Sequence, residues 1–430
     1  MTSNTGGRRC AIGVAAASLQ LISCTSNGPA TTPATTEPAA TTVTPRVDDG
    51  VLRIGVLMPA SGAGASIGQS ARAGIRVAVN LVNAAGGVNG APVQLFIRDE
   101  GSDAVTAAVS LQQLIDAKVD AIIGPASSNT AVALAPTIVA AGVAACSPSA
   151  SALALDDFPD NHLLFRTIAS DSLQAEAMAK VIEQTGETRA AIVYVDDGYG
   201  RPFEQHLTAA LQRRGIAVSE SVGFAISDND LATDAGRLVN PDNGAIAIIG
   251  DPDAGSRMLA ALAEAIGSSP REIVVNDALR RPWSISLLGS VNAQLRRRVV
   301  GVSPSVRTED PVLLAAVAAE DPTATGLFAT QAYDCANLFM LAAQQGGSSE
   351  ADVIASLMVG VSTGGSACAT FADCRSLLDA GRNINYDGPG GLVELGASGD
   401  PEVAQFDQFS FDDGGRDVTT NTITVSYTGA

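Results

Sequence analysis

Short apolar runs alternate with amphipathic stretches from residue 51 onward, and one stretch shows the pattern most clearly. Residues 120–124 form an apolar run that stops at a Gly-Pro pair, as a buried strand does at its end. Small polar residues follow, and then apolar positions recur at helical spacing until Gly142 ends the helix. Residues 143–146 are mostly apolar again. The pattern therefore predicts a strand, a loop, a helix and a second strand, in that order.

The same alternation fills two long segments of the chain. In the first segment, strands are predicted at residues 51–57, 93–98, 120–124, 143–146 and 163–166, with helices at 67–85, 103–117 and 131–141. In the second, helices are predicted at 170–185, 201–214, 230–239 and 254–266, with strands at 190–195, 216–224, 245–250 and 272–275. Such alternation predicts the α/β class, with parallel sheets and helices on both faces.

The remaining chain is expected to complete these two lobes. From about residue 299 we expect it to return to the first lobe, with a long helix within residues 325–345. Polar and apolar positions alternate over residues 404–427, which predicts a terminal β-hairpin with its turn at 413–416. The expected division assigns residues 51–167 and 302–400 to lobe 1, and residues 168–301 and 401–430 to lobe 2.

The N-terminus has the pattern of an export signal. Arg8 and Arg9 precede a short apolar stretch, which predicts a signal peptide at residues 1–23 that is too short to span a bilayer. The arginine pair leaves both general secretory and twin-arginine export open. The sequence LISC, ending at Cys24, resembles a bacterial lipoprotein box, which implies lipid anchoring to the outer face of the bacterial cell membrane. Residues 24–50 are rich in Thr, Pro and Ala and predict a disordered linker.

Charge and cysteine content narrow the function further. The net charge is −19 and no basic patch is present, which excludes a nucleic-acid partner. Cys368 and Cys374 bracket a short polar loop, so in an exported protein we expect them to form a disulfide. Cys146 and Cys335 either pair or stay buried as thiols. The chain has two histidines, His162 and His206, and neither is near Cys368 and Cys374 in sequence, so we expect no metal site there and no cofactor.

Serine-rich loops follow two neighbouring strands of the first segment. Ser127 and Ser128 lie in the loop that opens a helix, and Ser149 and Ser151 lie in the loop SPSAS after the next strand. Ligands of open α/β sheets bind at the carboxyl ends of the strands, and a helix N-terminus attracts anions. A single serine there is usually only a cap or turn former. Two such loops side by side favour a shared site for a carboxylate.

Further candidates follow strands of the second segment. Tyr199, in DDGYG, either packs on the next helix or covers a ligand. Asp277 and Asp251 each follow a strand and are either solvated caps or counter-charges for a ligand cation. Tyr333 opens the long helix near the end of the chain, next to Asp334, which reads as a first-turn acid.

One motif suggests a hydrolase. GASIG, residues 64–68, matches the nucleophile elbow, but an elbow serine sits directly on the strand-to-helix turn, whereas Ser66 lies eight residues past Met58. A catalytic triad would also require His162 or His206.

A second motif suggests a dinucleotide enzyme. The spacing of Gly62, Gly64 and Gly68 differs by one residue from the dinucleotide-binding pattern G-x-G-x-x-G. Asp99 and Glu100 follow the second predicted strand, where an acid could bind a ribose. A glycine-rich loop shaped for another ligand explains these residues better. We therefore expect a protein that is not an enzyme.

Five segments resemble one known family. They are LRIGVLMPASGAGASIGQSARAGIRVAVNLVNAAGGVNGAPVQLFIRDE, AIIGPASSNTAVALAP, CSPSAS, FRTIASDSLQAEAMA and AAIVYVDDGYGRPFEQHLTAAL. Their order and spacing resemble the branched-chain amino-acid binding proteins of ABC importers. The resemblance implies a type I periplasmic-binding-protein fold, in which three crossover segments join two Rossmann-like lobes around a ligand cleft. It also implies a small zwitterionic ligand and an ABC permease as partners, and we expect a monomer.

The resemblance also implies roles for individual residues. Ser127, Ser128 and Ser151 would meet the ligand carboxylate, and Ser149 would offer a backbone carbonyl to the ammonium group. Tyr199 would cover the ligand, and Asp277 would face the ammonium group. The full candidate set for ligand binding is Ser61, Ser127, Ser128, Ser149, Ser151, Tyr199, Asp251, Asp277 and Tyr333. A sensor that signals to a membrane partner on the same fold is the alternative to an importer component.

Overall fold

A computed structural model describes residues 48–426, except 63, 229, 268, 281–290, 292, 306–310 and 392. The predicted signal peptide, the predicted lipidation site Cys24 and nearly all of the linker lie outside the described residues. Within the described part, no helix combines the length and the hydropathy of a membrane-spanning segment.

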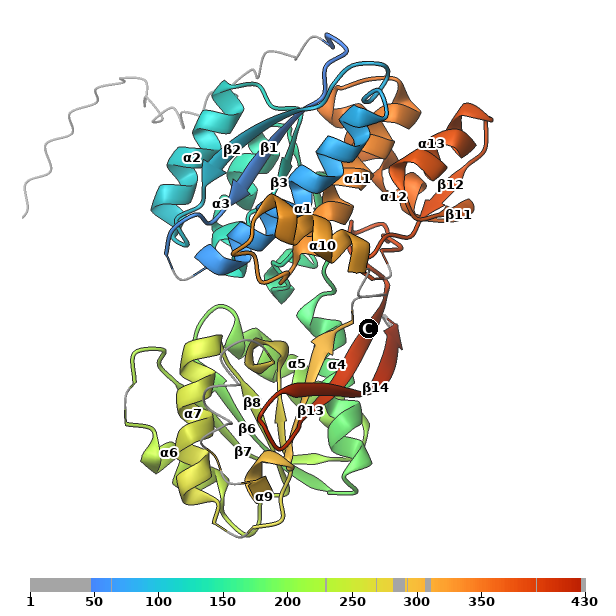
Figure 1. Ribbon diagram of the computed structural model, residues 1–430. Helices are drawn as coiled ribbons and strands as arrows, with labels where there is room; N and C mark the ends of the chain where they lie inside the picture. The colour runs from blue at the N-terminus through green and yellow to red at the C-terminus, as the bar shows by residue number, and fades with distance from the viewer. Residues whose placement is uncertain are drawn as a thin grey trace, which may run out of the picture. The chain divides into compact units, whose positions relative to one another are not determined.

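The first sheet contains five parallel strands in the order β2-β1-β3-β4-β5 (Figure 1). The strands are β1 Arg53–Met58, β2 Gln94–Asp99, β3 Ala121–Ile123, β4 Ala144–Ser147 and β5 Leu164–Arg166. The helices between them are α1 Ala65–Ala84, α2 Ala104–Asp116 and α3 Ser128–Ala140, and the 3-10 turn η1 Leu153–Leu155 follows β4. Each strand lies within a few residues of its predicted position.

Both faces of this sheet are buried, because side chains of a strand alternate between its faces. Ile54 and Val56 pack with α1 into one core cluster. Leu57, the residue after Val56, packs with α2 and α3 on the other face. The alternation of strand and helix in the sequence is thereby explained, since each strand needs a helix on each side.

The chain returns to this sheet late in the sequence. The returning elements are α10 Pro311–Glu320, α11 Ala329–Gly346, α12 Ala351–Ser362, β11 Ser366–Cys368, α13 Phe371–Asp379 and β12 Ile384–Tyr386. Helix α11 packs against α1 so closely that a Cβ on Gly74 would lie 2.1 Å from the carbonyl oxygen of Ala329. The disulfide Cys146–Cys335 ties β4 to α11, which answers the question that the sequence left open. The predicted disulfide Cys368–Cys374 is confirmed.

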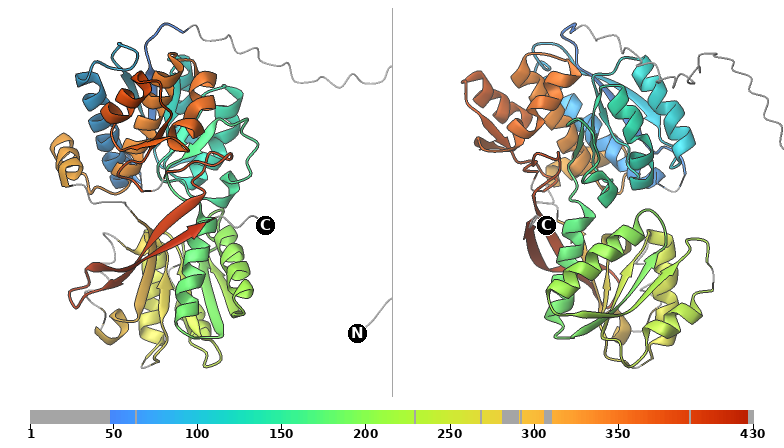
Figure 2. Two further views of the ribbon diagram at one scale, coloured as in Figure 1. Left: turned by 90° about the vertical axis from the view of Figure 1, so that its right-hand side faces the viewer. Right: turned by 180° about the vertical axis from the view of Figure 1, so that it is seen from behind.

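The second sheet contains seven strands in the order β14-β13-β10-β9-β8-β6-β7 (Figure 2). The strands are β6 Arg189–Val195, β7 Ala217–Phe224, β8 Ala245–Ile249, β9 Ile273–Val275, β10 Val299–Pro304, β13 Val403–Phe411 and β14 Asp417–Ser426. The helices are α4 Asp171–Gln184, α5 Gly200–Arg213, α6 Ala232–Leu238, α7 Pro252–Ala265 and α9 Ala293–Arg296, with a 3-10 turn η2 Asp277–Leu279. Strands β6 to β10 are mutually parallel. On one face of the sheet Ile192 packs with α4 and α5, and on the other face Val193 packs with α6 and α7.

Two further predictions concern the terminal hairpin and the residue at which the chain returns to the first lobe. The hairpin is confirmed, because β13 and β14 pair antiparallel and β13 adds to β10 at the edge of the second sheet. The return to the first lobe comes later than the expected residue 299. Strand β10 pairs with β9 over Val299–Gly301 and with β13 over Gly301–Pro304, so the chain stays in the second sheet as far as Pro304. The α/β class with two largely parallel sheets is confirmed, whereas the division into lobes at the stated residues stays a prediction.

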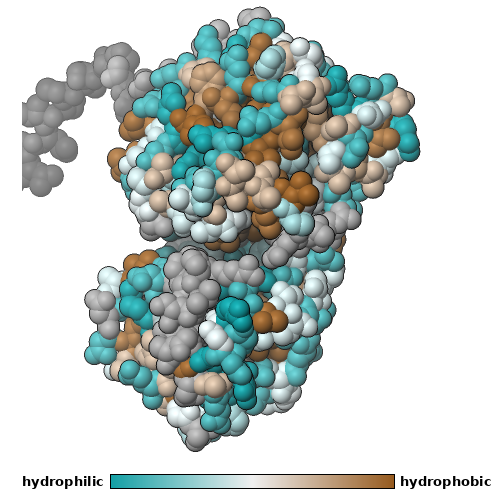
Figure 3. Space-filling model, in the orientation of Figure 1, coloured by the Kyte–Doolittle hydropathy of each residue, from teal (hydrophilic) through white to brown (hydrophobic). Residues whose placement is uncertain are grey.

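The outer surface mixes polar and apolar residues. On the face drawn in Figure 3, apolar atoms (brown) gather over the region of α1 and α10. Leu81 of α1 and Val312 of α10 are 56% and 77% exposed. Exposed apolar side chains of this kind are common on globular proteins.

Candidate functional site

The two serine-rich loops lie against each other at the carboxyl ends of β3 and β4. The Ser149 hydroxyl donates to the carbonyl oxygen of Ala126 at 2.8 Å. The backbone N–H of Ala152 donates to the Ser128 hydroxyl at 3.3 Å. The loop that opens α3 and the loop that follows β4 are therefore held together, as the two-loop pattern predicted.

A buried acid that the sequence did not single out for this loop sits at the N-terminus of α3. The Glu100 carboxylate accepts hydrogen bonds from the backbone N–H groups of Ala126 (2.7 Å) and Ser127 (3.1 Å). Its side chain is buried, and burial raises the pKa of Glu100 although these hydrogen bonds act against the shift. Two of the N–H groups before α3 thus already have an acceptor within the protein.

Asp99, the other acid proposed to bind a ribose, also accepts hydrogen bonds from groups of the protein. It accepts hydrogen bonds from the backbone N–H of Ala60 at 2.6 Å and from the hydroxyl of Ser61 at 2.7 Å. Burial raises the pKa of Asp99, but these bonds and one from the N–H of Gly101 outweigh it and lower the pKa to about 2. Asp99 and Glu100 therefore order the loops after β1 and β3, which argues against the dinucleotide interpretation.

Asp171 is the residue that the sequence analysis missed. It is the first residue of α4, it is fully buried, and neither carboxylate oxygen makes a hydrogen bond of standard geometry. Its backbone N–H donates to the carbonyl oxygen of Ser151 at 2.9 Å. Burial, and then the negative charge of Asp277, raise the pKa of Asp171 to about 8, while the nearby Ser151 hydroxyl favours the charged form. A buried carboxylate with no hydrogen bond of standard geometry is unusual and calls for a functional explanation.

Asp277 and Tyr199 lie close to this carboxylate. Asp277 accepts a hydrogen bond from the side chain of Gln174 at 2.9 Å, and burial raises its pKa. Burial raises the pKa of Tyr199 well above its ordinary value, and the charges of Asp171 and Asp277 add to the shift. The Tyr199 oxygen accepts a 3.0 Å hydrogen bond from the side chain of Asn276. Two carboxyl groups and a phenol therefore share one poorly solvated region.

Three other predicted site residues have structural roles within the protein. The Ser61 hydroxyl is bonded to Asp99, as described above. Asp251 caps α7, because its Oδ1 accepts hydrogen bonds from the N–H groups of Asp253 and Ala254 at 2.8 and 2.7 Å. Tyr333 is 7% exposed and belongs to the core cluster around α11. The structure thus brings together Ser128, Ser149, Ser151, Tyr199 and Asp277, with Ser127 in the same loop as Ser128.

The hydrolase interpretation finds no support in the geometry. Ser66 lies exposed in the first turn of α1, not at a strand-to-helix turn. His162 Nδ1 lies 3.3 Å from the carbonyl oxygen of Ala397, and His206 Nδ1 lies 3.2 Å from that of Pro202. Among the described residues, no hydrogen bond joins either histidine to Ser66, and no cluster of His, Cys, Asp and Glu is arranged to hold a metal ion.

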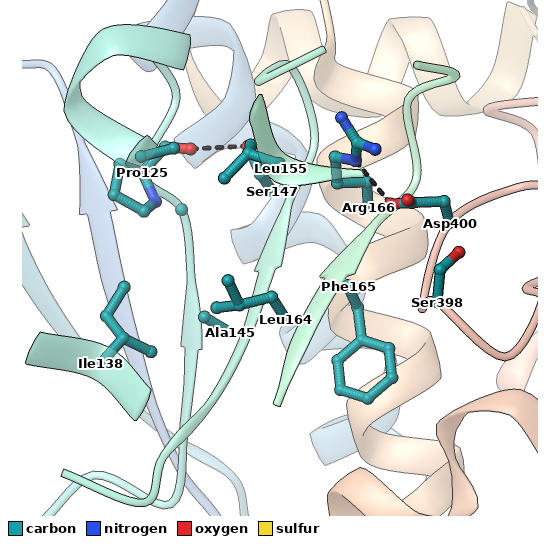
Figure 4. Close-up of a pocket in the computed structure, with 12 residues that line it drawn as sticks. Pro125, Ile138, Ala145, Ser147, Leu155, Leu164, Phe165, Arg166, Ser398 and Asp400 are labelled. Carbon is teal, nitrogen blue, oxygen red and sulfur yellow. Dashed lines mark hydrogen bonds and ion pairs between the residues drawn. The ribbon is translucent and has the colours of Figure 1, made fainter. Parts of the chain in front are cut away.

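A small cavity lies behind the serine loops (Figure 4). Its volume is about 30 Å³, which is room for one or two water molecules and too little for an amino acid. Ser147 donates to the carbonyl oxygen of Pro125 on one side of it, and Arg166 pairs with Asp400 on the other. Arg166 is 3% exposed and also pairs with Asp156 at 2.6 Å. The cavity is part of the support for the loops and not a ligand site.

Comparison with known proteins gives a consistent result. Residues 51–398 match the periplasmic binding protein family. A chemotactic signal transduction substrate-binding protein of Halobacterium salinarum is 30% identical over 81% of this chain and 84% of its own length. The leucine-, isoleucine-, valine-, threonine- and alanine-binding protein of Pseudomonas aeruginosa is 27% identical over 42% of this chain, and the match spans 48% of that protein.

Solved structures share the fold. A branched-chain amino acid transporter substrate-binding protein of Streptococcus pneumoniae, in complex with isoleucine, superimposes with a TM-score of 0.68 at 21% identity, over 88% of this chain and all of that one. A solute-binding protein of an ABC transporter from R. palustris, in complex with benzoate, gives a TM-score of 0.68 at 17% identity, over 88% and 98% of the two chains. The strand order, the paired lobes and the family match agree: the chain belongs to the periplasmic binding protein family and has the type I fold of the branched-chain amino acid binding proteins.

Proposed function

We propose that this protein binds an amino acid between its two lobes and delivers it to an ABC importer. The observation that carries the proposal is the contact between Ser151 and Asp171. It puts a hydroxyl and loop N–H groups, which suit a carboxylate, next to a buried acid, which suits an ammonium group. A zwitterion that carries both groups on one carbon suits donors and an acid that lie side by side.

The carboxylate end of the ligand would meet Ser128 and Ser151, with Ser127 and Ser149 beside them. The first N–H groups of a helix have no acceptor within the helix, so those of α3 beyond the pair used by Glu100 are suited to an anion. The partial positive charge of the helix N-terminus adds to this preference. Hydroxyl groups and N–H donors together select a planar, charged oxygen pair.

The ammonium end would meet Asp171 and Asp277, with Tyr199 covering it. A cation placed between the two acids would relieve their mutual repulsion and supply a hydrogen-bond donor to the carboxylate oxygens of Asp171. An aromatic acid such as benzoate has no such cation, so it would leave the carboxyl groups of Asp171 and Asp277 facing its ring. The proposal therefore favours amino acids over the aromatic acids that some structural relatives bind.

Lobe closure would convert binding into a signal for transport. A ligand that contacts groups of both lobes only in the closed form shifts the equilibrium toward that form by its differential affinity. The closed form would dock on a permease. Periplasmic binding proteins act outside the cytoplasmic membrane, and Cys24, outside the described residues, would anchor this one as a monomeric lipoprotein after export.

A sensor is the second candidate function. The Halobacterium relative is named as a substrate-binding protein of a chemotactic signalling system, and it is similar over most of its length. A sensor would use the same ligand and the same closure, but its closed form would contact a signalling receptor. Neighbouring permease and ATPase genes would favour the importer, and a neighbouring receptor gene would favour the sensor.

A thermal-shift panel tests the proposal. The twenty L-amino acids are compared with benzoate and glycerol at pH 7, and Kd is then measured by calorimetry for the amino acid that raises Tm most. We expect at least one amino acid to raise Tm by several degrees and benzoate to have no effect. Stabilisation by benzoate and by none of the amino acids would contradict the proposal.

A further inference from the structure

Asn276 is a buried amide at the junction of three elements of the second lobe. It follows β9, its side chain is fully buried, and it precedes Asp277 in η2. Its Nδ2 group donates to the carbonyl oxygen of Gly250 at 3.0 Å, and its Oδ1 accepts from the Gly250 N–H at 3.3 Å. This reciprocal pair fixes the orientation of the amide, because the opposite orientation would face donor to donor.

The second donor position of the same amide is directed at Tyr199. Nδ2 donates to the Tyr199 oxygen at 3.0 Å. The Tyr199 ring packs edge-on against the buried ring of Phe203, with centroids 5.9 Å apart and planes at 85°. The ring is thus fixed by packing and its oxygen by the amide.

This arrangement determines where the tyrosine proton can go. A phenol has one O–H donor, and an oxygen that accepts from an amide turns its own proton elsewhere. The acids whose charges act on Tyr199 are Asp171 and Asp277, with Asp197 contributing less. A phenol is protonated at physiological pH, and burial raises the pKa of Tyr199 further above its ordinary value, so the hydroxyl keeps its proton. Tyr199 is therefore available as a donor on the side of Asp171 and Asp277.

We propose that Asn276 is a positioning residue for ligand binding: by donating to the Tyr199 oxygen, it directs the tyrosine hydroxyl toward Asp171, Asp277 and a bound amino acid. The inference rests on the proposed function. Asn276 itself touches no ligand, and its effect passes through the Tyr199 hydroxyl. A serine or an aliphatic residue in its place would leave that hydroxyl free to rotate away.

A double-mutant cycle tests the inference. The probe is the L-amino acid that stabilises the wild-type protein most, and Kd is measured by calorimetry for wild type, Asn276→Ala, Tyr199→Phe and the double variant. We expect Asn276→Ala to weaken binding roughly tenfold in the wild type and less than about twofold in the Tyr199→Phe background. An equal loss in both backgrounds would overturn the inference, because a merely structural role does not depend on the hydroxyl.

The control variant is Asn243→Ala in the same lobe. Asn243 is also a buried amide, and its Nδ2 donates to the carbonyl oxygens of Arg237 and Leu238. The Asn243→Ala variant should have a lower Tm than wild type and an unchanged Kd for the amino acid. If Asn276→Ala does not fold, Asn276→Ser, whose hydroxyl can still pair with Gly250, replaces it in the cycle.

The result separates the inference from the proposed function. If no amino acid binds the wild-type protein, the proposed function fails and the inference falls with it. If an amino acid binds and the cycle shows no coupling between Asn276 and Tyr199, the inference alone fails.

Discussion

The backbone N–H of Asp171 donates to the carbonyl oxygen of Ser151 at 2.9 Å, which joins the start of α4 to the loop after β4. The loop end carries hydroxyl and N–H donors, and the helix start carries a carboxylate that has no hydrogen bond of standard geometry. Donor groups that suit an anion and a carboxylate that suits a cation therefore lie next to each other where the chain passes from one sheet to the other. A zwitterion carries one negative and one positive group and therefore suits such a pair of adjacent groups.

Replacement of Asp171 by Asn should make the ligand-free protein more stable at alkaline pH. Because the pKa of Asp171 rises from 3.8 to about 8 on folding, the folded protein retains a proton that the unfolded chain has lost. The stability that this group contributes is present below about pH 4 and is lost as the pH rises to about 8. The full difference corresponds to at most about 6 kcal/mol.

Thermal unfolding of wild type and Asp171→Asn between pH 5 and 9 measures this effect. The advantage of the variant should grow with pH and level off above about pH 8. Asp251→Asn is the control, since asparagine caps a helix as well as aspartate does, and it should behave as wild type. A constant difference between Asp171→Asn and wild type at every pH would contradict the raised pKa.

Glu100 should stabilise the protein through hydrogen bonding and not through its charge. Glu100→Ala removes the acceptor of the Ala126 and Ser127 N–H groups, and each buried N–H left alone costs roughly 1–3 kcal/mol. Glu100→Gln keeps an acceptor for one of the two N–H groups but turns its NH2 donor toward the other, so it should cost roughly 1–3 kcal/mol, about half the loss of Glu100→Ala. Urea unfolding distinguishes them, and equal losses for both variants would show that the charge is what matters.

Arg166 should be one of the most sensitive positions in the fold. Arg166→Met would leave the carboxylates of Asp156 and Asp400 without their buried cation, at a cost of about 3–5 kcal/mol. Arg201→Met removes an exposed ion pair with Asp196 and should cost less than about 1 kcal/mol. Chemical denaturation of the two variants gives the comparison. Similar losses would mean that the buried network contributes no more than a surface pair.

The two disulfides should differ in their effect on stability. Cys146–Cys335 spans 189 residues and Cys368–Cys374 spans 6. Loop-closure entropy then gives about 5 kcal/mol for the long loop and about 2 kcal/mol for the short one. Double alanine variants of each pair, compared by urea unfolding, should show the larger loss for Cys146 and Cys335. A larger loss for the short loop would contradict the entropic account.

Much of the fold follows from local pattern, because strand and helix periodicity are properties of neighbouring residues. The candidate residues Ser128, Ser151, Tyr199 and Asp277 could be proposed from the same pattern, since strand ends in a parallel sheet share one edge. Asp251 occupies the same kind of position and turned out to cap α7. Position at a strand end therefore selects candidates but does not distinguish a cap from a ligand group.

Asp171 could not be found from sequence for a physical reason. It follows the N-cap Ser170 and reads as an ordinary first-turn acid, a place where aspartate is common. Its burial and its proximity to Asp277 depend on segments about a hundred residues apart. The partner of Cys146 was undecided for the same reason, because 189 residues separate it from Cys335.

A crystal structure of the complex with the amino acid that stabilises the protein most tests the central claim directly. The account predicts the ligand carboxylate within about 3 Å of the Ser128 and Ser151 donors, and its ammonium group within about 3 Å of Asp171 and Asp277. A ligand bound with its ammonium group in solvent, or away from both acids, would contradict it.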